Sequence, residues 1–225
     1  MTDGPPGRDE QADDPIHDRA DADPAPGSEH LASQWGRLTG LGLAVLSALG
    51  LTASLTLSID KVRLLQDPSY VPSCNFNPLL SCGSVMDTDQ AAVFGFPNPF
   101  LGLIGFAIML TVAVLVVAGS RLPKPIVIGG AVGSLTGAGF VHWLIFQSIY
   151  RIEALCPWCM VVWAVTIPLA LWFTLAALDR VGGAAVRRVV DVVHQWRVTV
   201  LAAWYLAVAA LILVRFWDYW STVLA

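Results

Sequence analysis

Five long apolar stretches without a charged side chain set the limits on how this chain can fold. They span residues 38–59, 98–120, 125–150, 154–178 and 198–214. Each is close to the roughly 20 residues that a helix needs to cross the apolar core of a bilayer. Backbone amides in lipid must be paired within the segment, so we expect each stretch to be a helix. The sequence predicts an all-α membrane protein: a four-helix transmembrane bundle with a fifth, C-terminal transmembrane helix.

The composition agrees with a membrane protein. Of 225 residues, 56% are hydrophobic and 13% are charged, whereas soluble domains carry about 25% charged residues. The acidic residues gather in segment 1–33, which is also rich in Pro and Gly. Such a segment buries too little apolar surface to fold, so we predict a disordered acidic tail. The remaining chain is only mildly basic, and a nucleic-acid partner is not indicated.

Lysines and arginines near the helix ends predict the orientation, because they favour the cytoplasmic side. More of them are cytoplasmic if the N-terminus lies on the cytoplasmic side of a plasma (inner) membrane. Segment 60–97 is then an extracytoplasmic loop, and segment 181–197 is a basic cytoplasmic connector before the fifth helix. The inside group is Arg8, Arg19, Arg37, Arg121, Lys124, Arg180, Arg187, Arg188 and Arg197, against Lys61, Arg63, Arg151 and Arg215 outside.

The predicted external loop mixes charges, prolines, asparagines and short apolar patches. A connection of this length is expected to fold over the mouth of the bundle. Phe94, Phe96 and Phe100 either anchor it in the membrane interface or belong to the ordinary belt of interfacial aromatic residues.

Four cysteines carry the chemistry that the sequence suggests. Cys74 and Cys82 follow one predicted crossing, and Cys156 and Cys159 follow three, so both pairs lie on the extracytoplasmic face, where disulfides persist. Cys156-Pro-Trp-Cys159 opens the fourth helix, and positions i and i+3 share a helical face. Free amides at a helix N-terminus favour a thiolate, which is the attacking species in disulfide exchange. We therefore expect a reactive Cys156.

Three other interpretations remain open at this point. Four cysteines can bind zinc, although the Cys74-x7-Cys82 spacing is wide for a zinc knuckle. They can also form two inert disulfides, although Cys159 would then lie at the lipid boundary without a structural reason. The third is a non-enzymatic transporter or assembly subunit with structural disulfides. Transporters usually have broken helices or charged residues within the membrane, whereas the first four predicted spans contain no Asp, Glu, Lys or Arg.

The motifs together resemble a known family. CPWC opens a transmembrane helix, an external loop with Cys-x7-Cys precedes it, and GFPNPFLGL opens the second helix. Over residues 36–178 the chain is similar to the vitamin K epoxide reductase family in its bacterial form. Members are four-helix bundles that hold a quinone near the Cys-x-x-Cys.

The resemblance implies a path for electrons. Cys74 and Cys82 would be the shuttle pair that faces a partner, Cys156 would exchange with Cys82, and Cys159 would lie next to the quinone. The quinone would be menaquinone or ubiquinone. The partner would be a thioredoxin-like extracytoplasmic disulfide oxidase, expected as a separate chain because no thioredoxin domain follows the bundle.

The resemblance also implies three cofactor-binding residues. Asn98 falls where the family places a polar residue that bonds a quinone oxygen, and Thr88 matches a Ser or Thr of the loop. Trp163 stands where vertebrate members carry a tyrosine, and its indole donates a hydrogen bond but accepts none.

The third helix contributes two further hypotheses. His142 is an ionisable residue within the membrane, so it is either functional or a neutral side chain bonded to a backbone carbonyl. Gly129, Gly133 and Gly137 recur every four residues, which predicts a close helix contact.

Overall fold

The computed structural model describes Met1 and residues 26–224, with side chains described from residue 36 to residue 222. Within 26–224 the regular elements are helical, apart from one isolated β-bridge. They are α1 (Pro26–Gln66), α2 (Cys82–Met86), η2 (Asp89–Ala92), α3 (Pro99–Val117), α4 (Lys124–Gln147), η3 (Ser148–Ile152), α5 (Pro157–Val181), α6 (Ala184–Arg215) and α7 (Trp217–Leu224).

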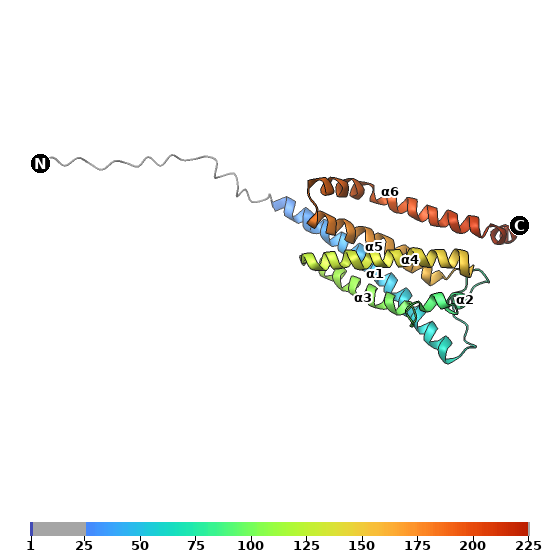
Figure 1. Ribbon diagram of the computed structural model, residues 1–225. Coiled ribbons are helices and arrows are strands. Elements are labelled where there is room, and N and C mark those ends of the chain that lie inside the picture. Colours follow the sequence, from blue (N-terminus) through green and yellow to red (C-terminus); the bar gives the residue numbers. More distant parts are fainter. Residues whose placement is uncertain (2–25, 225) are drawn as a thin grey trace.

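Helices α1, α3, α4 and α5 run side by side as a bundle, and α6 lies along its α5 side (Figure 1). Helix α1 packs against α3 and α5, and α4 packs against α5. Five helices of the described chain are long and apolar enough to cross a membrane: Gly36–Gln66 of α1, α3, Lys124–Ile152 of α4 and η3, α5 and α6. The predicted all-α membrane protein is confirmed.

Small residues let the helices of the bundle approach closely. A Cβ atom on Gly102 of α3 would collide with Ser54 of α1, and one on Gly130 of α4 would collide with the ring of Phe173 of α5. Phe173 is 1% exposed. Glycine is therefore needed at these two contacts, because no side chain fits between the helices.

Two predicted boundaries differ from the structure. Helix α1 begins at Pro26, so residues 26–33 of the predicted tail are helical, whereas residues 2–25 lie outside the described residues. The predicted connector 181–197 is mostly the first part of α6, which continues without a break through Arg215. Only Gly182 and Gly183 separate α5 from α6. The basic residues of this segment have good helix propensity, and after Gly183 it contains no Gly or Pro.

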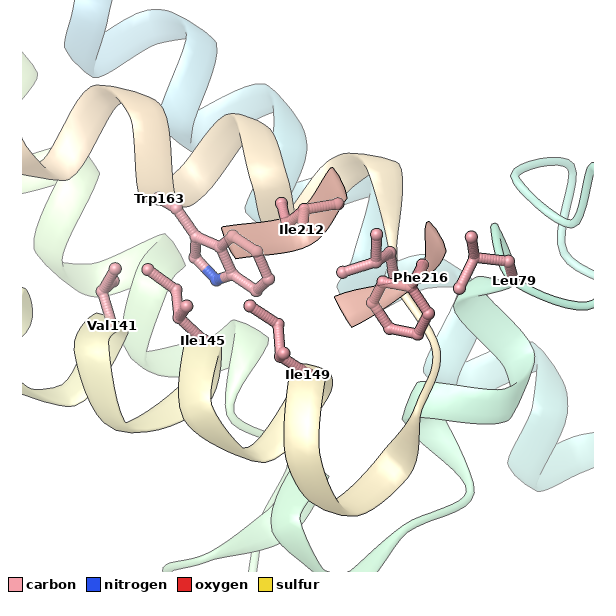
Figure 2. Packing of buried hydrophobic residues seen from close by; sticks show 8 residues of the cluster. Leu79, Val141, Ile145, Ile149, Trp163, Ile212 and Phe216 are labelled. Carbon is pink, nitrogen blue, oxygen red and sulfur yellow. The ribbon is translucent and has the colours of Figure 1, made fainter. Parts of the chain in front are cut away.

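Helix α6 belongs to the packed structure at the end of the bundle that carries the loop. Ile212 and Phe216, close to its C-terminal end, pack in one cluster with Leu79 of the loop and Trp163 of α5 (Figure 2). Arg215 forms an ion pair with Glu153, just before α5. The hydroxyl of Tyr205 donates to the carbonyl of Ala164 (2.6 Å). The fifth helix thus covers α5 and contacts the segment that leads to Cys82.

Candidate functional site

The loop between α1 and α3 is folded by its asparagine side chains. Asn77 Oδ1 accepts hydrogen bonds from the N–H groups of Leu79 (3.0 Å) and Leu80 (2.7 Å). Asn75 Oδ1 accepts one from the N–H of Gly83 (2.9 Å), which joins the stretch around Cys74 to α2. Asparagine is suited to this because its side chain mimics a backbone turn.

A short parallel β-bridge holds the loop against the chain before α5. Leu80 pairs with Leu155: Ser81 N–H donates to the carbonyl of Leu155 (2.9 Å), and Leu155 N–H donates to that of Leu79 (2.7 Å). A π-helical turn, η3, and the left-handed backbone of Glu153 (φ 56°) bring the chain back after α4 so that Leu155 can pair. The bridge sets Cys82 and Cys156 next to each other.

The four cysteine side chains form a continuous group. Cys74 and Cys82 are joined by a disulfide, and Cys156 and Cys159 are free thiols. The Cys156 Sγ donates to the Cys82 Sγ over 3.1 Å. Cys74, Cys82 and Cys156 are 3%, 0% and 1% exposed, in a cluster that includes Leu57 and Met86. The Cys74–Cys82 bond, called the outer disulfide below, and Cys156 are therefore in direct contact and shielded from water, whereas Cys159 is half-buried.

Cys156 is the N-cap of α5, just before the membrane-spanning part of that helix, and Pro157 occupies the first turn. The N–H of Cys159 donates to the Cys156 Sγ (3.4 Å). The pKa of Cys156 is lowered, first by a hydrogen bond from the Cys159 side chain and further by the N–H groups of Cys159 and Trp158; burial and the charge of Asp60 act in the opposite direction. Free amides at a helix N-terminus stabilise a thiolate in this way.

Beside the thiols lies a cavity of about 560 Å³ between α1, α3, α4 and α5, a size usual for a small-molecule site. Its lining includes Cys159, and its wall on α4 contains Gly129, Gly133 and Gly137. A Cβ atom on Gly129 or Gly133 would meet no neighbour within 4 Å. The prediction of a close helix contact is therefore wrong for Gly129 and Gly133, which leave open space on the cavity side of α4. Gly137 does face α5, where a Cβ atom would lie 3.8 Å from Thr166, and the tight contact with α5 uses Gly130.

The three predicted quinone-binding residues all line this cavity. The indole of Trp163 is 3% exposed, and its Nε1 has no hydrogen-bond partner among the described residues. Thr88 donates to the carbonyl of Val85 (2.8 Å). Asn98 Nδ2 donates to the carbonyl of Gln90 (2.7 Å), and its Oδ1 accepts from the N–H of Val93 (3.2 Å). Trp163 thus offers a free donor, whereas Asn98 already holds the loop around η2.

His142 makes contacts that account for a neutral side chain. Its Nδ1 lies 2.7 Å from the carbonyl of Ala138, and its Nε2 accepts from the indole of Trp204 on α6 (2.9 Å). A carbonyl needs a donor and the indole needs an acceptor, so the proton is on Nδ1. The histidine is not part of the cavity lining, and it links α4 to α6.

Asp60 is a site residue that the sequence reasoning missed. It lies on α1 at 4% exposure, and its charge acts on Cys156. The available signal was its position: it is the first charged residue after the apolar stretch 38–59, and it precedes the loop with Cys74 and Cys82.

Comparison with known proteins agrees with this geometry. The family model described as "Vitamin K epoxide reductase family" matches residues 41–175, more than half of the chain. No match to the chain is found among curated proteins. The matched range contains the loop, the disulfide, the Cys-x-x-Cys pair and all of the cavity lining. The chain therefore belongs to the vitamin K epoxide reductase family and is a membrane thiol-disulfide oxidoreductase.

Proposed function

We propose that this protein reoxidises a separate thioredoxin-like disulfide oxidase and passes two electrons to a membrane quinone, which supports disulfide formation in secreted proteins. The observation that carries the proposal is the 3.1 Å contact between the sulfurs of Cys82 and Cys156. Exchange requires a thiolate to attack a disulfide sulfur directly. Two independent structural disulfides would not need this contact.

The bonding pattern corresponds to one step of a relay. A reduced partner would open the Cys74–Cys82 disulfide and leave two thiols. Before this transfer, Cys156 and Cys159 would form a second bond, the inner disulfide. The Cys82 thiolate then attacks Cys156 and displaces Cys159, after which Cys74 attacks Cys82 and displaces Cys156. The outer disulfide and the inner dithiol, as in the structure, are the products of this transfer.

The cavity fits a quinone in both shape and chemistry. Gly129 and Gly133 of α4 leave room for a flat ring, and most of the lining is apolar. Trp163 Nε1 is a buried donor without a partner among the described residues. Such a donor costs free energy until it is paired, and a quinone oxygen accepts hydrogen bonds. When bound, menaquinone or ubiquinone would supply the oxidising power of the reaction by taking up two electrons and two protons. Cys159 lies in the cavity lining, which supports its proposed role as the thiol that delivers them.

The loop presents an apolar surface for a protein partner. Val71 and Phe76 are 68% and 70% exposed on either side of Cys74, which is itself only 3% exposed. Aromatic and aliphatic side chains of this kind are typical anchors of protein interfaces. The partner's thiol can reach Cys74 only if the segment 71–76 moves, so we infer that docking opens this segment.

The proposed orientation has the N-terminus in the cytoplasm and the four cysteines on the outer side of the plasma (inner) membrane. The reason is the excess of Lys and Arg at the other end of the bundle. Arg180 at that end donates to the carbonyl of Leu122 (3.0 Å) in the turn between α3 and α4.

A coupled assay tests the function. Purified full-length protein is mixed with a reduced thioredoxin-like protein and a menaquinone or ubiquinone analogue, and quinone absorbance and partner thiols are followed together. We expect one quinone reduced per partner disulfide formed, and no reaction with Cys159→Ser. A non-enzymatic transporter or assembly subunit would show neither change. Quinone reduction without a need for Cys82 would refute the relay.

A further inference from the structure

Asp60 is an acidic side chain buried against the reacting cysteines. Leu57 and Leu64 lie one turn before it and one turn after it on the same face of α1. Both pack in the cluster formed by Cys74, Cys82 and Cys156. Asp60 is 4% exposed, so its carboxylate faces this cluster rather than lipid or water.

One oxygen of this carboxylate is free. Oδ1 accepts a hydrogen bond from the hydroxyl of Tyr70 in the loop (2.8 Å), whereas the buried Oδ2 has no partner among the described residues. The two nearby cations of α1 bind elsewhere: Lys61 Nζ donates to the carbonyl of Met86 (2.7 Å), and Arg63 Nη1 donates to the Tyr70 hydroxyl (3.4 Å). No ion pair of Asp60 is found within the described residues.

The titratable groups around Asp60 are few. They are Lys61 and Arg63 on α1, Tyr70 in the loop, Cys74 and Cys82 when reduced, and Cys156 and Cys159 on α5. The charge of Asp60 acts on Cys156 against the hydrogen bonds that stabilise its thiolate. A buried carboxylate oxygen without a partner is costly, and the S–H group of a neighbouring cysteine is a donor that can pair with it.

The proposed transfer moves two protons as well as two electrons. When the outer pair passes its electrons inward, Cys74 and Cys82 each lose a proton, and Cys156 and Cys159 each gain one. Cys74, Cys82 and Cys156 are at most 3% exposed, so bulk water is poorly placed to carry these protons. A group inside the cluster has to hold each proton between donor and acceptor.

We propose that Asp60 is the proton-transfer residue of the relay, its free Oδ2 taking each proton from the outer pair and returning it to the inner pair. This inference rests on the proposed function. First, Cys82 gives its proton to Asp60, forms a bond to Cys156 and breaks the Cys156–Cys159 bond; the electron pair leaves on Cys159, which receives the proton from Asp60. Then Cys74 gives its proton to Asp60, forms a bond to Cys82 and releases Cys156, which is protonated in turn. Asp60 is again a carboxylate at the end of the transfer.

The alternative is that Asp60 only anchors the loop through Tyr70, and matched variants separate the two roles. Asp60→Asn keeps an acceptor for the Tyr70 hydroxyl but cannot hold a proton. Tyr70→Phe removes the hydrogen bond between Tyr70 and Asp60 and keeps the carboxylate. Asp60→Glu restores a carboxylate.

The measurement is the opening of the inner disulfide in oxidised full-length protein mixed with excess dithiothreitol. Samples are quenched with acid, alkylated and mapped by mass spectrometry. Cys82→Ser gives the rate of direct attack by dithiothreitol on the inner pair, which is subtracted. We expect Asp60→Asn to slow the opening by about a hundredfold, a usual contribution of a positioned acid or base. Tyr70→Phe should stay within about fivefold of wild type, the effect of one hydrogen bond, and Asp60→Glu should be faster than Asp60→Asn.

The pH dependence gives a second readout that a structural role would not change. The profile is measured at dithiothreitol concentrations where the rate no longer rises with its concentration, so that transfer between the pairs limits the opening and the ionisation of dithiothreitol does not enter. With an internal base, the wild-type rate should then vary little between about pH 6 and pH 8, and the defect of Asp60→Asn should shrink above about pH 8.5, where thiols ionise unaided. A wild-type rate that rises about tenfold per pH unit would contradict the proposal even if Asp60→Asn fails to fold, because it would mean that bulk solvent removes the proton.

Two further outcomes separate a failure of this inference from a failure of the relay. A loss in Tyr70→Phe at least as large as that in Asp60→Asn, with parallel pH profiles, would leave Asp60 as a loop anchor and refute its proton transfer while the relay stands. Equal rates in wild type and Cys82→Ser would instead refute the relay, and this inference with it.

Discussion

Leu80 pairs with Leu155 through backbone hydrogen bonds, and this pairing sets Cys82 beside Cys156. The contact between the two sulfurs is thus determined by the backbone, across 74 residues of sequence. The N–H groups of Leu79 and Leu80, in turn, are held by the side chain of Asn77. The rate of exchange between the cysteine pairs should therefore depend on a residue that touches no sulfur.

Asn77→Ala tests this dependence. The variant loses two hydrogen bonds in the turn, which should destabilise the paired segment by about 1–3 kcal/mol. Formation of the Cys82–Cys156 bond in a Cys159→Ser background, followed by non-reducing peptide mapping, should be several-fold slower. Asn77→Asp keeps the accepting oxygen and should be close to the parent. An unchanged rate in Asn77→Ala would mean that the turn does not control the approach of the sulfurs.

The lowered pKa of Cys156 predicts how its reactivity depends on pH. A lower pKa means that more thiolate is present at any pH below the ordinary thiol value of about 8.5, so reactivity should persist as the pH falls. The ultraviolet absorbance of the Cys156 thiolate, followed in protein with Cys74 and Cys82 replaced by Ser, should reach half its maximal change at a lower pH than that of a free cysteine.

Cys159→Ala in the same background is the control for that profile, because Cys156 stays a free thiol when Cys82 is absent. The side chain of Cys159 is the first cause of the lowered pKa, so its loss should move the half-maximal point to higher pH. If the profiles of the two proteins coincide, the hydrogen bond from Cys159 does not stabilise the thiolate.

The sequence predicted the features that depend on local composition. Runs of apolar residues predicted the membrane helices, and the place of the Cys-x-x-Cys motif at the beginning of the fourth run predicted Cys156 at the start of α5. Features that depend on contacts between distant segments could not be predicted. The spacing of Gly129 and Gly133 is the same whether they face a helix or a cavity, and the direction of Asp60 depends on how the loop folds onto α1.

The glycines on the cavity wall give a test of the proposed quinone site. Gly133→Leu should fill part of the cavity and raise the quinone concentration needed for half-maximal rate by about tenfold or more, because overpacking costs about 1–3 kcal/mol. Exchange between the cysteine pairs should continue. Gly139→Leu is the matched control: Gly139 is on the same helix, has open space around it and is not in the cavity lining. Equal quinone dependence in both variants would exclude this cavity as the quinone site.

His142 should contribute to stability rather than to chemistry. His142→Ala removes its hydrogen bonds to Ala138 and Trp204, which should lower the free energy of unfolding by about 1–3 kcal/mol. Thermal unfolding in detergent should show a lower Tm, with quinone reduction near the wild-type rate below that temperature. A large loss of quinone reduction with no change in Tm would instead assign His142 to the reaction.

The central claim is that Cys82 passes electrons to Cys156, and trapping the bond between them tests it most directly. In Cys159→Ser, Cys156 attacks Cys82 of the outer disulfide and releases Cys74, and no thiol remains next to Cys156 to resolve the new bond. Non-reducing peptide mapping of the purified variant should find Cys82 linked to Cys156 and Cys74 free. If mapping instead finds Cys74 linked to Cys82, in a variant that still reduces quinone at the full rate, the four cysteines do not form a relay.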